Sequence, residues 1–150
     1  MAKGVMIVAE QRDGALRKIS FELASTARKL ADQTGDEVSA VLLGSGVEAM
    51  AAELGKYGVD KVFVGENAAL DPYVTEAHAE VTAKVIKDND PAIVLFGASV
   101  QGKDLSARVA AKLATGLATE ASSRPAATAL ERTTAGSSSP MRGKIDFVCG

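Results

Sequence analysis

The chain has 150 residues, of which 47% are hydrophobic and 4% aromatic, so a core must be built from Val, Leu, Ile and Ala. The formal net charge of −2 argues against a nucleic-acid-binding domain, which usually carries a basic stripe. No apolar run approaches the ~20 residues needed to span a bilayer. The single cysteine, Cys149, allows no internal disulfide and the N-terminus lacks a signal-peptide layout, so we expect a cytoplasmic protein.

The first predicted elements are a strand, a helix and a second strand. Residues 4–9 are an apolar run typical of a buried strand, and the polar stretch after them carries the turn signal Asp13-Gly14. A helix is predicted from about residue 20 to residue 34, before Gly35, which suits a left-handed C-cap. Residues 37–43 predict the second strand.

The next segments repeat this order. Gly44-Ser45-Gly46 is an ordinary strand-to-helix connection or a phosphate-binding loop, and residues 47–54 predict a short amphipathic helix after it. Residues 60–64 predict the third strand, and a polar loop follows. A long helix is then expected with Pro72 in its first turn, an end near Asp90, and an apolar stripe of Val74, Ala77, Val81 and Val85.

The stretch Val94–Leu113 joins a strand, a loop and a helix. Residues 91–96 form an apolar run typical of a strand buried on both faces. Residues 97–102 predict a loop of small residues, after which Asp104 caps a helix with the apolar positions Leu105, Val109 and Leu113. Strand, loop and helix in this order form half of a βαβ unit.

Strands and helices alternating at this spacing predict a three-layer α/β fold, a mostly parallel sheet with helices on both faces. We expect a single α/β domain over residues 1–150, with a regular βαβα core over residues 1–119. Residues 120–150 are expected to be an irregular loop, in which Ile145–Cys149 has the pattern of a last strand.

The loop of residues 97–102 is the main candidate binding site. Ligands bind at the carboxyl ends of the strands in open α/β sheets, and backbone N–H groups at a helix start suit a phosphate or carboxylate. The candidate cofactor-binding residues are therefore Ser99, Gln101, Gly102 and Lys103. The alternative is that the glycines only permit a tight turn while Asp104 caps the helix.

Arg108 has two interpretations. It lies four residues after Asp104, a spacing that favours an ion pair on the surface of one helix. Its guanidinium also suits a carboxylate on a partner protein, which makes Arg108 the candidate partner-facing residue.

Catalytic and metal chemistry find no support in the sequence. His78 is the only histidine and is expected to be partly exposed on its helix, whereas a metal site needs three or four ligands. One histidine and a terminal cysteine assemble neither a Ser-His-Asp nor a Cys-His arrangement. We therefore predict no catalytic residue and no metal site.

Several stretches match one known family in collinear order. They are Val8–Leu23, Val41–Gly46, Tyr57–Val62, Tyr73–Ala77 and Leu95–Thr119, the last with the pattern Phe-Gly-Ala-Ser-X-X-Gly-Lys-Asp-Leu-X-X-Arg-X-Ala. These stretches resemble the N-terminal domain of the alpha subunit of electron transfer flavoprotein, with Lys103 where arginine is usual and Ser106-Ala107 where Ala-Pro is usual. A weaker match, Ser139–Lys144, resembles a later Arg-Pro…Gly-Lys element of that family.

The resemblance implies a Rossmann-like domain of adenine-nucleotide-hydrolase-like topology that docks against a beta subunit. The complete heterodimer would carry electrons from acyl-CoA or other dehydrogenases to a quinone reductase or another acceptor. FAD would be held mainly by the C-terminal domain of the alpha subunit, and AMP is expected in the beta subunit. The chain is expected to end before the FAD domain, as a fragment or a shortened relative. The resemblance therefore assigns it no FAD-binding residue and no chemistry of its own.

Two other interpretations come from different classes. A stand-alone nucleotide-binding module resembling the universal stress proteins would use the loops after the first, second and fourth strands. Against it, no further phosphate loop of matching glycine spacing lies near the C-terminus. An α/β interaction protein without any ligand is the third interpretation.

Overall fold

The computed structural model describes residues 3–97, 99–114, 117–118 and 144–148. Its main strands are β1 Val5–Val8, β4 Val38–Gly44, β5 Lys61–Glu66, β6 Ile93–Gly97, β7 Leu117–Ala118 and β8 Lys144–Val148. Its α-helices are α1 Lys18–Thr34, α2 Glu48–Gly55, α3 Thr75–Asn89 and α4 Val100–Leu113. Shorter elements are the antiparallel pair β2 Gln11–Arg12 and β3 Ala15–Leu16, and the 3-10 turn η1 Ala68–Leu70.

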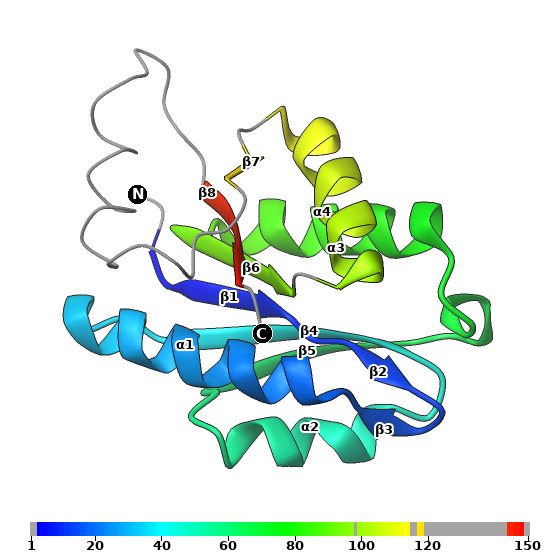
Figure 1. Ribbon diagram of the computed structural model, residues 1–150, viewed down its shortest axis with the longest axis horizontal. Coiled ribbons are helices and arrows are strands. Elements are labelled where there is room, and N and C mark those ends of the chain that lie inside the picture. The colour runs from blue at the N-terminus through cyan, green and yellow to red at the C-terminus, as the bar shows by residue number, and fades with distance from the viewer. Residues whose placement is uncertain (1–2, 98, 115–116, 119–143, 149–150) are drawn as a thin grey trace.

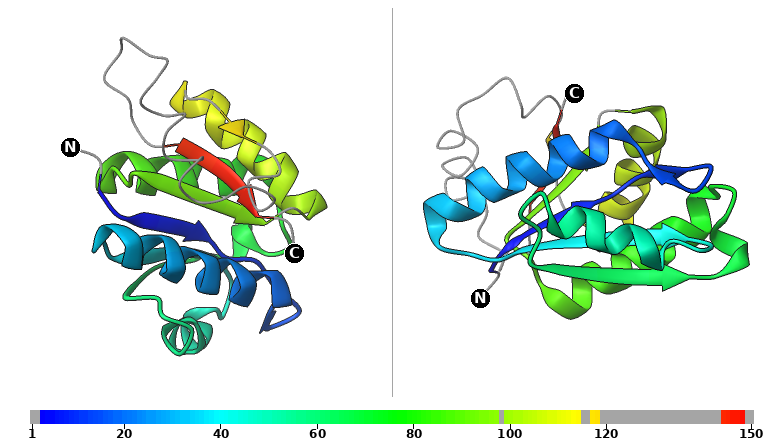
Figure 2. Two further views of the ribbon diagram at one scale, coloured as in Figure 1. Left: turned by 60° about the vertical axis from the view of Figure 1, so that its left-hand side comes forward. Right: turned by 90° about the horizontal axis from the view of Figure 1, so that it is seen from below.

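The six main strands form one sheet with the order β5-β4-β1-β6-β8-β7, and β2 and β3 form a separate two-stranded sheet (Figure 1). Every pairing in the six-stranded sheet is parallel. Helices α1 and α2 cover one face, and α3 and α4 cover the other (Figure 2). The predicted three-layer α/β fold is confirmed, and the strand order reverses at β1, as in doubly wound folds.

Two apolar cores lie on the two faces of the sheet. In β1, Val5 and Ile7 pack into the core under α1 and α2, whereas Met6 and Val8 pack into the core under α3 and α4. A strand covered on both faces must be apolar at every position, because successive side chains point to opposite faces. This requirement explains why the apolar runs predicted the central strands well.

Both early turn signals are confirmed. Asp13 and Gly14 take positive φ values of 52° and 78° and connect β2 to β3. Gly35 ends α1 with φ 72°, and its backbone N–H donates to the Ala31 carbonyl. Left-handed backbone of this kind favours glycine at a helix end.

Helix α3 differs from the prediction in its start and its buried face. Pro72 lies in the loop before the helix, which begins at Thr75, so its predicted place in the first turn is wrong. Val74 is 47% exposed, and the residues buried against the sheet are His78, Ala79, Thr82, Ala83 and Ile86. Of the predicted stripe, Ala77, Val81 and Val85 are partly buried and pack against the same core, and only Val74 is exposed.

Helix α4 begins four residues before the predicted cap. Ser99, not Asp104, is the N-cap, since its Oγ accepts a hydrogen bond of 3.0 Å from the Gly102 backbone N–H. Asp104 lies inside the helix and accepts hydrogen bonds from the hydroxyl groups of Tyr73 and Thr75. Of the predicted loop of residues 97–102, Gly97 thus ends β6 and residues 100–102 belong to the helix.

The last predicted strand is found as β8, shifted by one residue from the expected Ile145–Cys149. It pairs in parallel with β6 and with β7. The expected irregular stretch over residues 120–143 lies outside the described residues, as does Cys149.

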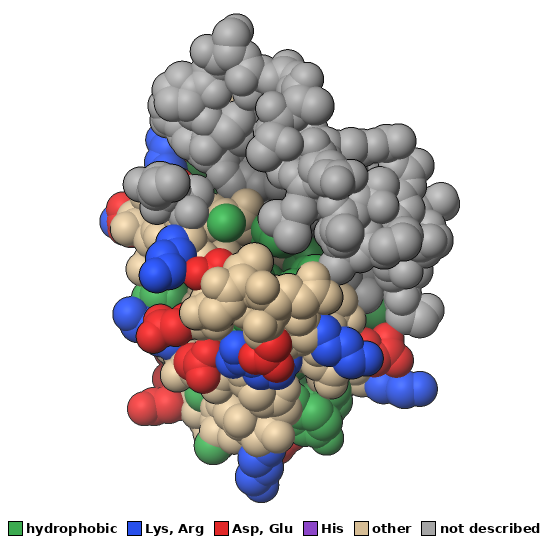
Figure 3. Space-filling model, turned by 90° about the vertical axis from the view of Figure 1, so that its left-hand side faces the viewer, with side chains coloured by type: hydrophobic (Ala, Val, Ile, Leu, Met, Phe, Trp, Pro, Cys, Tyr) green, Lys and Arg blue, Asp and Glu red, His purple; other side chains and the backbone are tan. Residues whose placement is uncertain are grey.

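At the amino ends of the strands, Arg28 of α1 joins several segments. Its guanidinium lies 2.8 Å from Asp32 and 2.9 Å from Asp60, and it donates to the carbonyl oxygens of Asp36 and Gly58. Figure 3 shows this end of the molecule, where acidic and basic side chains are interspersed over the described surface. On the part of this face that the structure describes, the basic side chains form no stripe of the kind that binds nucleic acid.

Candidate functional site

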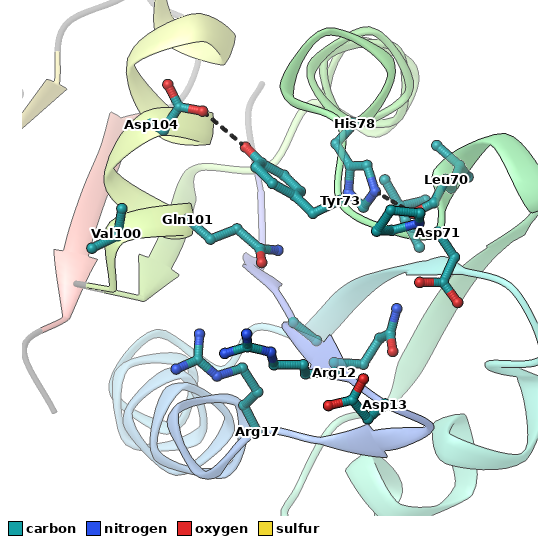
Figure 4. Close-up of a pocket in the computed structure, with 14 residues that line it drawn as sticks. Arg12, Asp13, Arg17, Leu70, Asp71, Tyr73, His78, Val100, Gln101 and Asp104 are labelled. Carbon is teal, nitrogen blue, oxygen red and sulfur yellow. Dashed lines mark hydrogen bonds between the residues drawn. The ribbon is translucent and has the colours of Figure 1, made fainter.

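The carboxyl ends of β1 and β6 lie side by side at the point where the strand order reverses. The chain leaves β1 toward α1 on one face and β6 toward α4 on the other. Open α/β sheets form their ligand crevices at such points. Here a pocket of about 830 Å³ opens between the β2–β3 ribbon, the loop before α3 and the first turns of α4 (Figure 4).

Beside this pocket lies a buried carboxylate that the sequence analysis missed. Glu10, which follows β1, is only 3% exposed. Its Oε2 lies 3.1 Å from Arg17 Nη1, and its Oε1 accepts a hydrogen bond of 2.6 Å from Ser99 Oγ. Its backbone N–H donates to Ser20 Oγ, and its carbonyl accepts from the same hydroxyl. The signal in the sequence was a charged residue directly after a wholly apolar strand, where a side chain lies at the carboxyl edge of the sheet.

Two glycines bring the start of α4 close to this carboxylate. A Cβ on Gly102 would lie 1.9 Å from the Gly97 carbonyl oxygen and 2.9 Å from Glu10 Oε1. A Cβ on Gly97 would lie 2.8 Å from Ile19 Cγ1. Any larger residue would push the helix away, so the glycines serve close packing rather than left-handed backbone.

The four predicted cofactor-binding residues lie at the N-cap and in the first turn of α4 but take different positions. Ser99 caps the helix and contacts Glu10, and the buried Gly102 uses its N–H in that cap. Gln101 is half-buried and lines the pocket. Lys103 is exposed and does not line the pocket. Of these four residues, only Gln101 lines the pocket.

Arg108 does not form the ion pair with Asp104 that was one of its two interpretations. Its Nη1 lies 3.4 Å from Glu76 Oε2 of the neighbouring helix α3. Lys112, one turn further along α4, lies 2.7 Å from Glu76 and 3.1 Å from Glu80. These exposed pairs tie α4 to α3, because Asp104 is already occupied by Tyr73 and Thr75.

His78 lines the far wall of the pocket and is only 5% exposed, so the prediction of a partly exposed histidine is wrong. Its Nε2 lies 2.8 Å from the Leu70 carbonyl oxygen in η1, a partner that allows the ring to be buried. The Tyr73 ring packs edge-on against it, with the ring centroids 4.8 Å apart. Burial raises the pKa of the Tyr73 phenol, and the neighbouring Asp104 carboxylate adds to the rise. Tyr73 therefore stays protonated and donates to Asp104.

The pocket carries opposite charges on two sides (Figure 4). The guanidinium groups of Arg12 and Arg17 lie on the side of the β2–β3 ribbon that faces Gln101. The Asp71 carboxylate lies on the other side of the pocket, near Leu70, whereas the Asp13 carboxylate lies on the same ribbon as Arg12. The site is thus suited to a polar ligand with an anionic end.

Among the described residues, no group of three or more His, Cys, Asp and Glu side chains is placed to hold a metal ion. None of the described helices combines the length and apolar character needed to cross a membrane.

Comparison with known proteins shows the family. The family model described as "Electron transfer flavoprotein domain" matches residues 5–138. The electron transfer flavoprotein subunit alpha of Syntrophomonas wolfei is 46% identical over 118 residues, which cover 79% of this chain and 36% of that protein. The corresponding subunit of Clostridium acetobutylicum is 40% identical over 121 residues, covering 81% of this chain and 36% of that protein.

A third relative carries a different name. The acryloyl-CoA reductase electron transfer subunit beta of Anaerotignum propionicum is 44% identical over 115 residues, covering 77% of this chain and 31% of that protein. The chain thus spans about a third of the length of these curated relatives. The family match and the parallel α/β fold show that the chain belongs to the electron transfer flavoprotein family, and they confirm its resemblance to the N-terminal domain of the alpha subunit.

Proposed function

We propose that this domain is the scaffold of an electron transfer flavoprotein alpha subunit and docks against a beta subunit. The match of the family model over residues 5–138, with alpha subunits 40% and 46% identical, carries this proposal. In the proposed heterodimer, another domain of the alpha subunit holds FAD and the beta subunit holds AMP. The complete complex moves electrons from acyl-CoA or other dehydrogenases to a quinone reductase or another acceptor.

The proposal gives this domain no chemistry of its own. Among the described residues, the two buried titratable ones both contact other parts of the fold: Glu10 contacts Arg17 and Ser99, and His78 contacts the Leu70 carbonyl. We place the protein in the reducing cytoplasm, because the single cysteine of the chain allows no internal disulfide.

The outer face of α4 is the docking surface that we favour. Val100 at the start of this helix is 89% exposed. A partner that buried this side chain would gain about 1.5 kcal/mol or more. One turn beyond the exposed Lys103 and Asp104, Ala107 and Arg108 are exposed as well, so this face combines single apolar side chains with charged ones. The Arg108 side chain is 59% exposed and contacts Glu76 through Nη1, which leaves further N–H donors for a partner's carboxylate.

Binding to a purified beta subunit tests this proposal. We expect the 150-residue chain to form a one-to-one complex in size-exclusion chromatography with light scattering. Val100→Glu is expected to weaken binding about tenfold or more, because it places a charge in an apolar contact. Lys29→Glu, on the opposite face of the sheet, is the control and should bind as the parent does. Absence of a complex would refute docking, and unchanged binding by Val100→Glu would exclude this face.

The colour of the purified chain tests the placement of FAD. We expect a colourless protein without flavin absorbance, because the proposal assigns the flavin to another domain. Flavin absorbance at one equivalent per chain would contradict that placement.

A further inference from the structure

We propose that the pocket at the carboxyl edge of the sheet binds a nucleoside phosphate. The phosphate would lie against Arg12 and Arg17, and the sugar and base would lie toward Tyr73 and η1. This inference goes beyond the scaffold role and stands on separate observations, namely the position, size and polarity of the pocket.

The position and size of the pocket fit a small molecule. It opens beside the carboxyl ends of β1 and β6, where the strand order reverses. Its volume of about 830 Å³ falls within the range of about 300–1,000 Å³ that ligand pockets occupy. A nucleoside phosphate fills a space of this order, whereas an inorganic anion would contact only one end of it.

The arginine side of the pocket supplies donors for a phosphate. Arg17 is anchored through Nη1 by the buried Glu10 carboxylate at 3.1 Å, which leaves further N–H donors of its guanidinium available. Arg12 is exposed and has no ion-pair partner among the described residues. Figure 4 shows both guanidinium groups on the side of the pocket that faces the Gln101 amide. Paired guanidinium groups recognise phosphate through charge-assisted hydrogen bonds.

The opposite side supplies a different kind of surface. The edge-on pair of Tyr73 and His78 offers a ring surface against which a base can pack. Beside it, Asp71 presents carboxylate oxygens that can accept hydrogen bonds from sugar hydroxyls or a base amino group (Figure 4). A ligand that is anionic at one end and rich in donors at the other matches both sides. An apolar ligand would instead bury the Arg12 guanidinium, which has no ion-pair partner among the described residues.

Calorimetric titration of the 150-residue chain tests the inference, with AMP, adenosine and inorganic phosphate as separate ligands. We expect saturable binding of AMP at one site, and affinities for adenosine and for phosphate that are each at least about tenfold weaker. Arg12→Gln should weaken AMP binding about tenfold or more, since it removes a charge-assisted hydrogen bond. Lys29→Gln removes the same charge from α1 and should leave the affinity unchanged.

Three results would overturn the inference. The first is the absence of saturable AMP binding by the parent chain. The second is phosphate binding as tight as AMP binding, which would indicate an anion site only. The third is an equal effect of Arg12→Gln and Lys29→Gln, which would place AMP elsewhere. Arg12 is exposed on the ribbon, so equal melting temperatures are expected for both variants and the parent chain. Docking of a beta subunit is measured separately and does not depend on these results.

Discussion

Glu10 Oε1 and Ser99 Oγ are joined by a hydrogen bond of 2.6 Å across 89 positions of the sequence. The same Ser99 oxygen accepts the Gly102 backbone N–H, so one side chain both caps α4 and ties it to the end of β1. Because the carboxylate is buried, its bonds to Ser99 and Arg17 have little competition from water. This contact determines where α4 begins and where the neighbouring pocket lies.

Replacing Glu10 should destabilise the fold. Glu10→Ala removes the partner of Ser99 and of Arg17, and leaves polar groups buried without an acceptor. We expect the free energy of unfolding to fall by about 2–3 kcal/mol, somewhat less than for a fully buried ion pair because Arg17 is 38% exposed. Glu37→Ala, at an exposed position, should change it by less than about 0.5 kcal/mol. Urea denaturation measures both, and equal effects would contradict the role assigned to Glu10.

The close approach at Gly102 gives a second prediction. Gly102→Ala places a Cβ 1.9 Å from the Gly97 carbonyl oxygen, so α4 must move, and we expect a loss of about 2–3 kcal/mol in unfolding free energy. Gly55→Ala in α2 meets nothing within 4 Å and should raise it by about 0.5 kcal/mol, since alanine favours helix. Thermal and urea unfolding of the two variants measure these changes. An unchanged unfolding free energy for Gly102→Ala would show that α4 can accommodate the added methyl group.

A buried hydroxyl on α3 predicts a stabilising substitution. Thr82 is fully buried, and its Oγ1 has no hydrogen-bond partner among the described residues. Thr82→Val replaces this hydroxyl by a methyl group of similar shape, so unfolding free energy should rise by about 1 kcal/mol. Thr75→Val instead removes a hydrogen bond to Asp104 and should lower it by about 1 kcal/mol. Destabilisation by both changes would mean that Thr82 has a partner in solution.

Asp60 predicts a dependence of stability on pH. A hydrogen bond from the Val38 backbone N–H, and then the Arg28 guanidinium, hold the pKa of this carboxyl below its ordinary value of 3.8. A lowered folded-state pKa stabilises the fold above the unfolded-state pKa, and this contribution is lost as pH falls through the folded-state value. The effect should be modest, because the Asp60 side chain is 46% exposed.

Asp60→Asn removes the charge and tests this dependence. Its unfolding free energy should lie below that of the parent near pH 7, and the difference should shrink toward about pH 3. Glu53→Gln, at an exposed position in α2, is the control and should show no such convergence. A difference that stays constant with pH would show that geometry, not charge, matters at Asp60. Urea unfolding across this range provides the measurement.

The sequence alone predicted the three layers and the main strands and helices in their order along the chain. Gly4–Ala9 and Pro91–Phe96 are apolar without interruption, which only a strand covered on both faces requires, and both contain central parallel strands. Asp13-Gly14 and Gly35 marked turns through local backbone preference, which depends on neighbours in the chain. The pattern around Gly102 and Asp104 also pointed to the right family before any contact was known.

Tertiary structure alone decided the site. Ser99 rather than Asp104 caps α4 because Glu10 lies within 2.6 Å of it. His78 can be buried because its ring nitrogen Nε2 has a hydrogen-bond partner in the Leu70 carbonyl, eight positions earlier in the chain. Arg12 and Gln101 meet at one pocket only because β1 and β6 are neighbours in the sheet. Periodicity reports which face of an element is apolar, but hydrogen bonds between distant segments determine the partners of its polar groups.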